Sequence, residues 1–124
     1  MSIRSALAAL LGASLCLALP SAQAAGKPDL AFAQESAECA AVMLKLWEVT
    51  DEGAEKQNYK DLAGIMIQAS VNAGANKEQM MGYQRNVDDG IRSGGTTYLS
   101  QKIDRCKAFV SDPESKLAHY AIGG

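Results

Sequence analysis

The stretch 30–49, LAFAQESAECAAVMLKLWEV, decides the fold of this chain. Its apolar and small residues recur at steps of three and four, which is the spacing of one face of an α-helix. They form two adjoining rows: Leu30, Ala33, Ala37, Ala40, Leu44 and Trp47, and Phe32, Ser36, Cys39, Met43 and Leu46. Glu35 and Glu38 fall on the opposite, polar side. The pattern predicts an amphipathic helix over about 30–49, with both glutamates in solvent.

The residues next to this stretch set its limits. Pro28 fits a first helical position, where its missing N–H is harmless, and Asp29 favours the positive end of the helix dipole. The polar segment 50–53 ends the helix.

A second helix is expected over about 54–73, where an apolar row holds Tyr59, Leu62, Met66, Ala69 and Ala73. Gly64 within it indicates either a close approach of two helices or a weak point. Gly74 suits the left-handed position that often follows a helix end.

Two further helices and a short turn complete the chain. Asn76 and Gln79 have the spacing of a capping box, which opens a helix over about 77–92 with the row Met80, Tyr83, Val87 and Ile91. Gly94 and Gly95 end it. Thr96 or Thr97 then caps a fourth helix over about 97–110, with the row Leu99, Ile103, Cys106 and Val110. A last helical turn is expected through Leu117 and Tyr120.

The pattern as a whole predicts an all-α protein, because no segment alternates with the period of a strand. Short connections favour a small antiparallel bundle of about four helices, running up, down, up and down. The first and fourth helices are then antiparallel neighbours. Cys39 and Cys106 lie on their apolar faces, so we expect them to form one disulfide, closing a loop of about 67 residues.

The first residues predict export. Arg4 precedes an apolar run from Ala6 to Leu19, and the triplet Ala22-Gln23-Ala24 resembles a cleavage site. Residues 1–24 are therefore expected to be a signal peptide, cleaved near Ala24, and residues 25–124 a single helical domain. The run is shorter than the roughly 20 residues of a membrane-spanning helix, so no stable anchor is expected after cleavage. Cys16 is expected to leave with the leader.

Charge and cysteine content limit the classes of partner and the cysteine chemistry that we expect. Without Arg4, the 12 Lys and Arg residues fall to 11 against 14 Asp and Glu, a net charge of −3. No basic cluster is interleaved with aromatic residues, so we expect no nucleic-acid partner. The two remaining cysteines, an even number in an exported chain, favour a structural disulfide over a redox motif.

No catalytic, cofactor-binding or metal-binding residue is predicted. His119 is the only histidine and has no nucleophile motif around it, while Asp88 and Asp89 are adjacent on a helix and face apart. The methionines, which would suit Cu(I) as a cluster, fall mostly on apolar rows. Met43 and His119 form the one conceivable haem pair.

These observations favour a periplasmic or secreted, non-enzymatic helical protein that binds another protein or a small ligand, in a stress-related or chaperone-like role. The alternatives are a metal or haem carrier built on a helical bundle and, after it, a small hydrolase.

Overall fold

The computed structural model of the chain describes residues 27–123 and contains four helices: α3 (Leu30–Val49), α4 (Ala54–Asn72), α5 (Lys77–Ser111) and α6 (Leu117–Ala121). The predicted signal peptide 1–24, its Cys16 and its cleavage site lie outside the described residues. Within 27–123 there is no strand, and no helix combines the length and apolar character needed to cross a bilayer. The predicted all-α class, with packed helices and one disulfide, is confirmed.

α3 has the predicted bounds, 30–49, but the residue that caps it differs from the prediction. Asp29 is the N-cap, and its Oδ1 accepts a hydrogen bond of 3.1 Å from the backbone N–H of Phe32. Pro28 therefore precedes the cap and is not the first helical residue. The carboxylate of Asp29 satisfies an N–H that the helix itself leaves unpaired, which fixes the start at this position.

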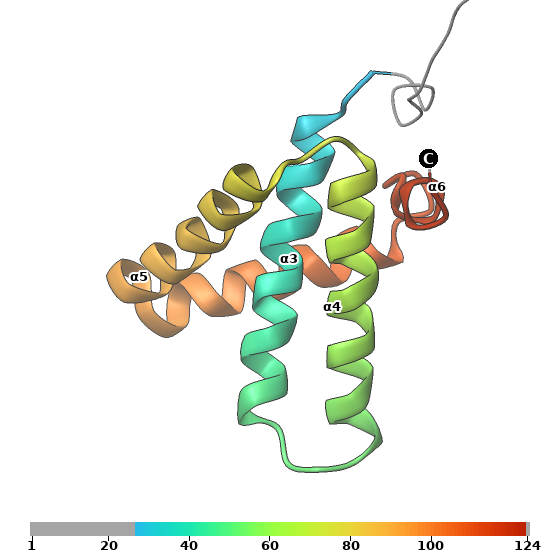
Figure 1. Cartoon of the computed structure of the whole chain (residues 1–124). Coiled ribbons are helices and arrows are strands. Elements are labelled where there is room, and N and C mark those ends of the chain that lie inside the picture. Colours follow the sequence, from blue (N-terminus) through green and yellow to red (C-terminus); the bar gives the residue numbers. More distant parts are fainter. Residues whose placement is uncertain (1–26, 124) are drawn as a thin grey trace, which may run out of the picture.

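Small residues bring α3 and α4 close together as an antiparallel pair (Figure 1). Ser36 Oγ donates to the carbonyl of Met66 at 2.8 Å, and Ser70 Oγ donates to the carbonyl of Ala33 at 2.9 Å. All four residues are buried, so these bonds satisfy hydroxyl groups that would otherwise be costly in the core. Gly64 takes no part in this contact, because a Cβ there would meet nothing within 4 Å.

The turn after α4 closes onto the start of α3. The backbone N–H of Asp29 donates to the carbonyl of Ala73 at 2.8 Å. Gly74 has a φ of +112°, and a Cβ on it would lie 2.8 Å from the Cβ of Pro28. Both the backbone conformation and the contact with Pro28 require glycine here.

α5 consists of two helical arms that meet at a sharp corner, a first arm (77–94) and a second arm (96–111). Gly95 forms the corner with φ 60° and ψ −145°. The predicted break at the glycines is confirmed, and so is the capping box of Asn76 and Gln79. The two predicted helices, 77–92 and 97–110, are both present, and the connection between them is shorter than predicted because Gly95 alone departs from helical φ/ψ.

The second arm runs across α3 and α4 in Figure 1, whereas the regular up-and-down arrangement would place it alongside them. The ring of Tyr98 covers Gly90 and Gly94 on the inside of the corner. Side chains on either glycine would collide with that ring. The three glycines of the corner therefore set the direction in which the second arm leaves.

Two apolar clusters hold the elements together. The larger contains Cys39, Met43, Met66, Val87 and Cys106, and it joins α3, α4 and both arms of α5. The smaller surrounds Phe32, whose ring lies 4.7 Å from that of Tyr120 on α6 and 5.7 Å from that of Phe109, measured between ring centroids. α6 is also fixed by a 2.7 Å hydrogen bond from the Asn72 amide to the carbonyl of Tyr120.

Candidate functional site

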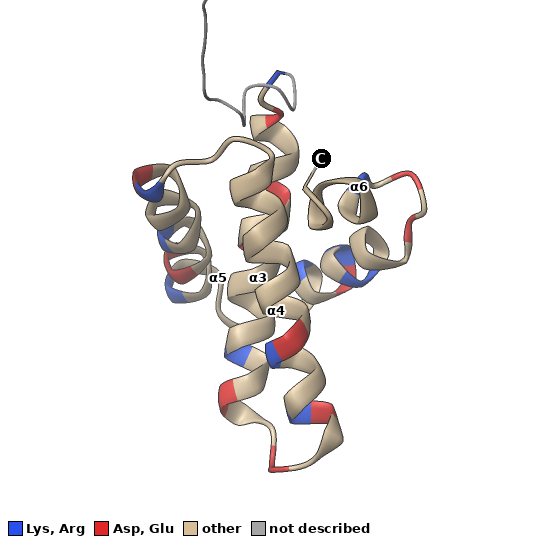
Figure 2. Cartoon of the chain, turned by 45° about the vertical axis from the view of Figure 1, so that its right-hand side comes forward, with Lys and Arg blue, Asp and Glu red and all other residues tan. Residues whose placement is uncertain are grey.

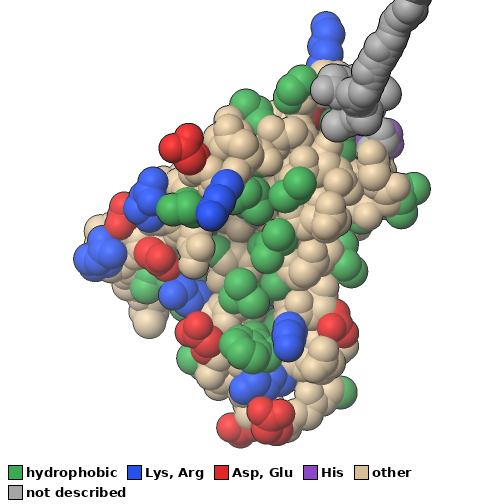
Figure 3. Space-filling view, viewed as in Figure 1, with side chains coloured by type: hydrophobic (Ala, Val, Ile, Leu, Met, Phe, Trp, Pro, Cys, Tyr) green, Lys and Arg blue, Asp and Glu red, His purple; other side chains and the backbone are tan. Residues whose placement is uncertain are grey.

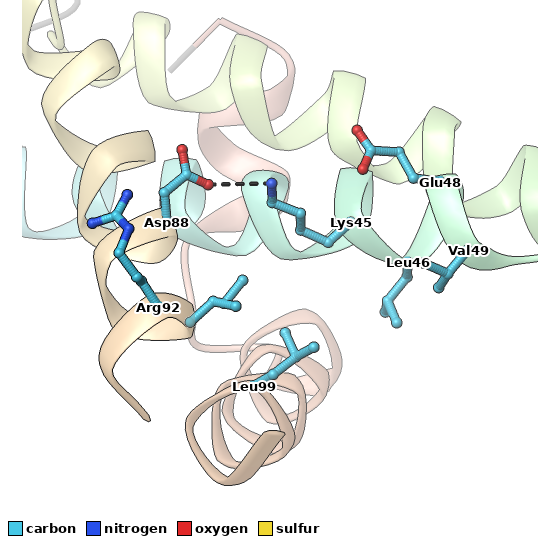
Figure 4. Close-up of a pocket in the computed structure, with 8 residues that line it drawn as sticks. Lys45, Leu46, Glu48, Val49, Asp88, Arg92 and Leu99 are labelled. Carbon is cyan, nitrogen blue, oxygen red and sulfur yellow. Dashed lines mark ion pairs between the residues drawn. The ribbon is translucent and has the colours of Figure 1, made fainter. Parts of the chain in front are cut away.

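A hollow lies at the corner of α5, and we call it the corner cleft. It has a volume of about 460 Å³ and is bounded by the last turns of α3 and by both arms of α5 (Figure 4). The second arm turns away from the first at Gly95, so the end of α3 and the two arms diverge around an unfilled space.

Aliphatic side chains make the walls of the corner cleft. Leu46 and Val49 come from α3, Ile91 from the first arm and Leu99 from the second arm. Val49 is 79% exposed, which is high for a branched aliphatic side chain. The apolar rows of three helices therefore all reach this cleft, and there they meet no further helix that would cover them.

Charged groups of both signs surround these walls. Lys45 Nζ lies 3.2 Å from Asp88 Oδ1, joining α3 to the first arm, and Arg92, which lines the cleft, pairs with Asp89 at 2.6 Å. Glu48 completes the rim (Figure 4). Charges of both signs also follow one another along α5 in Figure 2.

Asp88 has an unusual environment. Its Oδ1 is shielded from solvent, yet it accepts no hydrogen bond from any described residue. The ammonium of Lys45 is close enough for electrostatic attraction but does not have hydrogen-bond geometry. This oxygen is instead held by the ion pair with Lys45, while the Asp88 side chain as a whole is 35% exposed.

Glu38 corrects the sequence-based prediction. It was expected in solvent with Glu35, but it is 7% exposed and lies where the two arms of α5 meet α3. Its carboxylate accepts hydrogen bonds from Gln34 at 2.8 Å, Asn86 at 3.1 Å and Lys102 at 2.6 Å. Glu35 lies nearer the surface, 3.4 Å from Arg105.

The surroundings of Glu38 keep it ionised. Burial alone raises its pKa, but the hydrogen bonds from Lys102, Gln34 and Asn86, with the charge of Lys102, lower the pKa below its ordinary value of 4.5. Because its three donors come from α3 and from both arms of α5, the carboxylate of Glu38 links these three helical segments. None of these polar atoms lines the corner cleft.

The predicted disulfide is present. Cys39 and Cys106 are bonded, with Cα atoms 5.4 Å apart, and both are fully buried. This bond joins α3 to the second arm one turn from the contact of Glu38 with Lys102.

The other candidates of the sequence lie apart from the corner cleft, with Asp88 the exception. His119 is exposed on α6 with its ring edge-on to Tyr120, at a centroid distance of 4.8 Å. Met43 and Met66 are buried in the larger cluster, and Met81 is exposed on the first arm. Asp88 and Asp89 each pair with a different cation, as expected for neighbours on a helix.

The aromatic residues divide into core and surface. Tyr59 and Tyr83 pack against the two clusters, as predicted. Trp47 was predicted in the core but is only partly buried, with the ammonium groups of Lys56 and Lys60 at 5.1 and 5.9 Å from its ring centroid. The reason is its position in the last turn of α3, beyond the crossing with the second arm.

Few side chains that could bind a metal or haem lie close together in the described part of the chain. No group of three or more His, Cys, Asp or Glu side chains within residues 27–123 is arranged to hold a metal ion. Met43 lies inside the core, while His119 is on the surface of α6, so the structure does not present them as a haem pair.

Comparisons with protein-family models, with curated proteins and with solved structures gave no match. The interpretation of the corner cleft therefore depends on its own geometry and chemistry. The sequence carried one signal for it: the apolar rows of the helices predicted over 77–92 and 97–110 adjoin the glycines 94–95. The charged rim residues Lys45, Glu48 and Arg92 looked like ordinary solvated surface.

Proposed function

We propose that this chain is an exported helical protein that acts by binding rather than by catalysis, and that the corner cleft is its ligand site. The observation that carries the proposal is the apolar hollow of about 460 Å³, whose lining includes the carboxylates of Asp88 and Glu48. A ligand whose amine pairs with these carboxylates and whose apolar part fills the hollow would fit this site.

The chemistry of the cleft favours a ligand with an apolar body and an amine or hydroxyl group. Leu46, Ile91 and Leu99 supply apolar contact, while Asp88 and Glu48 supply acceptors. The volume of about 460 Å³ is within the range of about 300–1,000 Å³ typical of small-molecule sites. A free amphipathic amine and the lysine side chain of a partner protein share this chemistry.

A titration with matched probes tests the class of ligand. We would add hexylamine, and separately hexanoate, to the domain 25–124 and follow methyl NMR signals of Leu46, Ile91 and Leu99. Hexylamine is expected to shift these signals and hexanoate to shift them far less, because only the amine donates to Asp88. Equal binding of both probes, or shifts confined to other residues, would refute the proposed chemistry.

A pair of conservative variants tests the role of Asp88. Asp88→Asn is expected to weaken hexylamine binding by about tenfold, because a charge-assisted hydrogen bond is lost. Asp61→Asn is the matched control: it removes an exposed carboxylate of α4 that does not line the cleft. If both variants weaken binding equally, a general charge effect explains the result and the assignment of Asp88 fails.

Export and the natural ligand can be examined in one measurement. A native mass spectrum of the protein from the periplasm of its own host is expected to show residues 25–124 with the disulfide formed. An added mass that leaves on denaturation would identify the ligand, and the visible absorbance of the same sample would distinguish an amine from a haem or metal. A mass that retains residues 1–24 would refute the predicted cleavage.

A further inference from the structure

A second hollow lies on another face of the molecule, and we call it the front groove. It has a volume of about 230 Å³ and is bounded by α3, α4 and the first arm of α5. Its floor consists of Ala37, Ala40 and Ala41 on α3, all of which are buried. Figure 3 shows hydrophobic side chains gathered over these three elements on the face that it displays.

The rim of the front groove is also apolar, although it faces solvent. Ile67 on α4 is 39% exposed and Met81 on α5 is 48% exposed, and both line the groove. Single exposed apolar side chains are common, but a contiguous set around a hollow marks an interaction surface. The alanine floor lets another backbone approach closely, and methionine adapts its shape to what it contacts.

The charge of Lys77 distinguishes between the partners that could bind in the front groove. Lys77 is the only ionised side chain among the residues that line the groove, and it forms no ion pair or hydrogen bond with any residue of 27–123. A second copy of the chain docked face to face by a twofold axis would bring a second lysine into the same apolar interface. A partner with an acidic side chain at this place would instead complement the groove.

We propose that the front groove docks an amphipathic helix of a partner protein, with apolar residues on the floor and an acidic residue opposite Lys77. Three packed helices with a shallow apolar channel between them are the surface that this mode of recognition uses, with anchors one helical turn apart. The proposal is independent of the corner cleft, which lies at the opposite end of the first arm of α5 and shares no lining residue with the front groove.

Two synthetic helical peptides provide the probes. Both carry leucines at positions i, i+3, i+4 and i+7, and they differ only in having glutamates or lysines beside this row. Calorimetry on the domain 25–124 is expected to give at least tenfold tighter binding of the glutamate peptide, and Lys77→Glu is expected to reverse the preference. Equal affinity for both peptides would overturn the proposal.

Exposed positions on α4 provide a matched pair of variants that leave the core intact. Ile67→Glu is expected to abolish binding of the glutamate peptide, whereas Ile65→Glu, at a residue that is 46% exposed and outside the groove, is expected to leave it unchanged. Equal effects of the two variants would overturn the proposal. So would peptide-induced shifts at Leu46 and Leu99 instead of Ala41, or a dimer in sedimentation that Ile67→Glu disrupts.

Discussion

The ammonium of Lys102 lies 2.6 Å from the carboxylate of Glu38 at the point where the second arm of α5 crosses α3, and the two side chains are only 15% and 10% exposed. The same carboxylate accepts a hydrogen bond from Asn86 on the first arm. A single ionised group on α3 therefore joins both arms on either side of the corner at Gly95. Together with the disulfide one turn away, it fixes the angle between the arms and so the shape of the corner cleft.

Removing the cation should be costly. Lys102→Met leaves the charge of Glu38 in a mostly closed site with two neutral donors, Gln34 and Asn86. We expect the free energy of unfolding to fall by about 2–4 kcal/mol, since an uncompensated buried charge is strongly destabilising. Urea unfolding of the domain 25–124 at pH 7 measures the change.

The double variant Glu38→Met with Lys102→Met is the control for this prediction. It removes both charges and fills the space with apolar side chains, so most of the loss should be recovered. If the double variant is less stable than Lys102→Met alone, the loss comes from packing and not from the charge that is left unpaired.

The stability of the domain should fall in acid. Glu38 has a lowered pKa for the reasons given above, and the hydrogen bonds from Lys116 and from the backbone of Phe32 lower the pKa of Asp29 below 3.8. A carboxyl group with a lower pKa in the folded state stabilises the fold above its unfolded pKa, and this contribution disappears as the pH falls through the folded value. The loss should therefore begin near pH 4.5 and continue below pH 3.8.

Urea unfolding at pH 7, 5 and 3 compares the wild type with Glu38→Gln, which cannot titrate at this position. The variant is expected to be less stable at pH 7 and to lose less stability on acidification. Parallel curves for the two proteins would contradict the assignment. Binding of a hydrophobic dye at pH 3 but not at pH 7 would further test the chaperone-like role, which requires apolar surface to open in acid.

The helices could be predicted from sequence because local rules govern them, and the disulfide because only two cysteines follow the predicted leader and both lie on apolar helix faces. The 3.6-residue rows, the capping box at Asn76 and the glycines 94–95 all act within a few residues of the feature that they specify. The direction in which the second arm leaves Gly95 depends also on contacts far along the chain, such as the hydrogen bond of Lys102 to Glu38. Glu38 was misplaced for the same reason: the arm that buries it crosses α3 from the side that the pattern marks as polar.

Two glycines in helices should respond oppositely to alanine. At Gly64 a Cβ meets nothing within 4 Å, so Gly64→Ala is expected to stabilise the domain by about 0.5–1 kcal/mol through higher helix propensity. At Gly90 a Cβ would overlap the ring of Tyr98, so Gly90→Ala should destabilise it despite the same gain in propensity. Thermal unfolding of both variants makes the comparison, and a stabilised Gly90→Ala would contradict the close contact at the corner.

Loss of the disulfide should destabilise the second arm of α5 more than the other helices. In the unfolded chain it closes a loop of 67 residues, for which chain entropy gives a stabilisation of about 4 kcal/mol as an upper figure. The second arm also leaves the first arm at a flexible glycine, so its position depends on its bonds to α3. We expect Cys39→Ala with Cys106→Ala to lower the overall stability and to increase amide hydrogen exchange in 96–111 more than in α4. Uniform exchange in both regions would show that the bond stabilises the whole domain without a special role in holding the second arm.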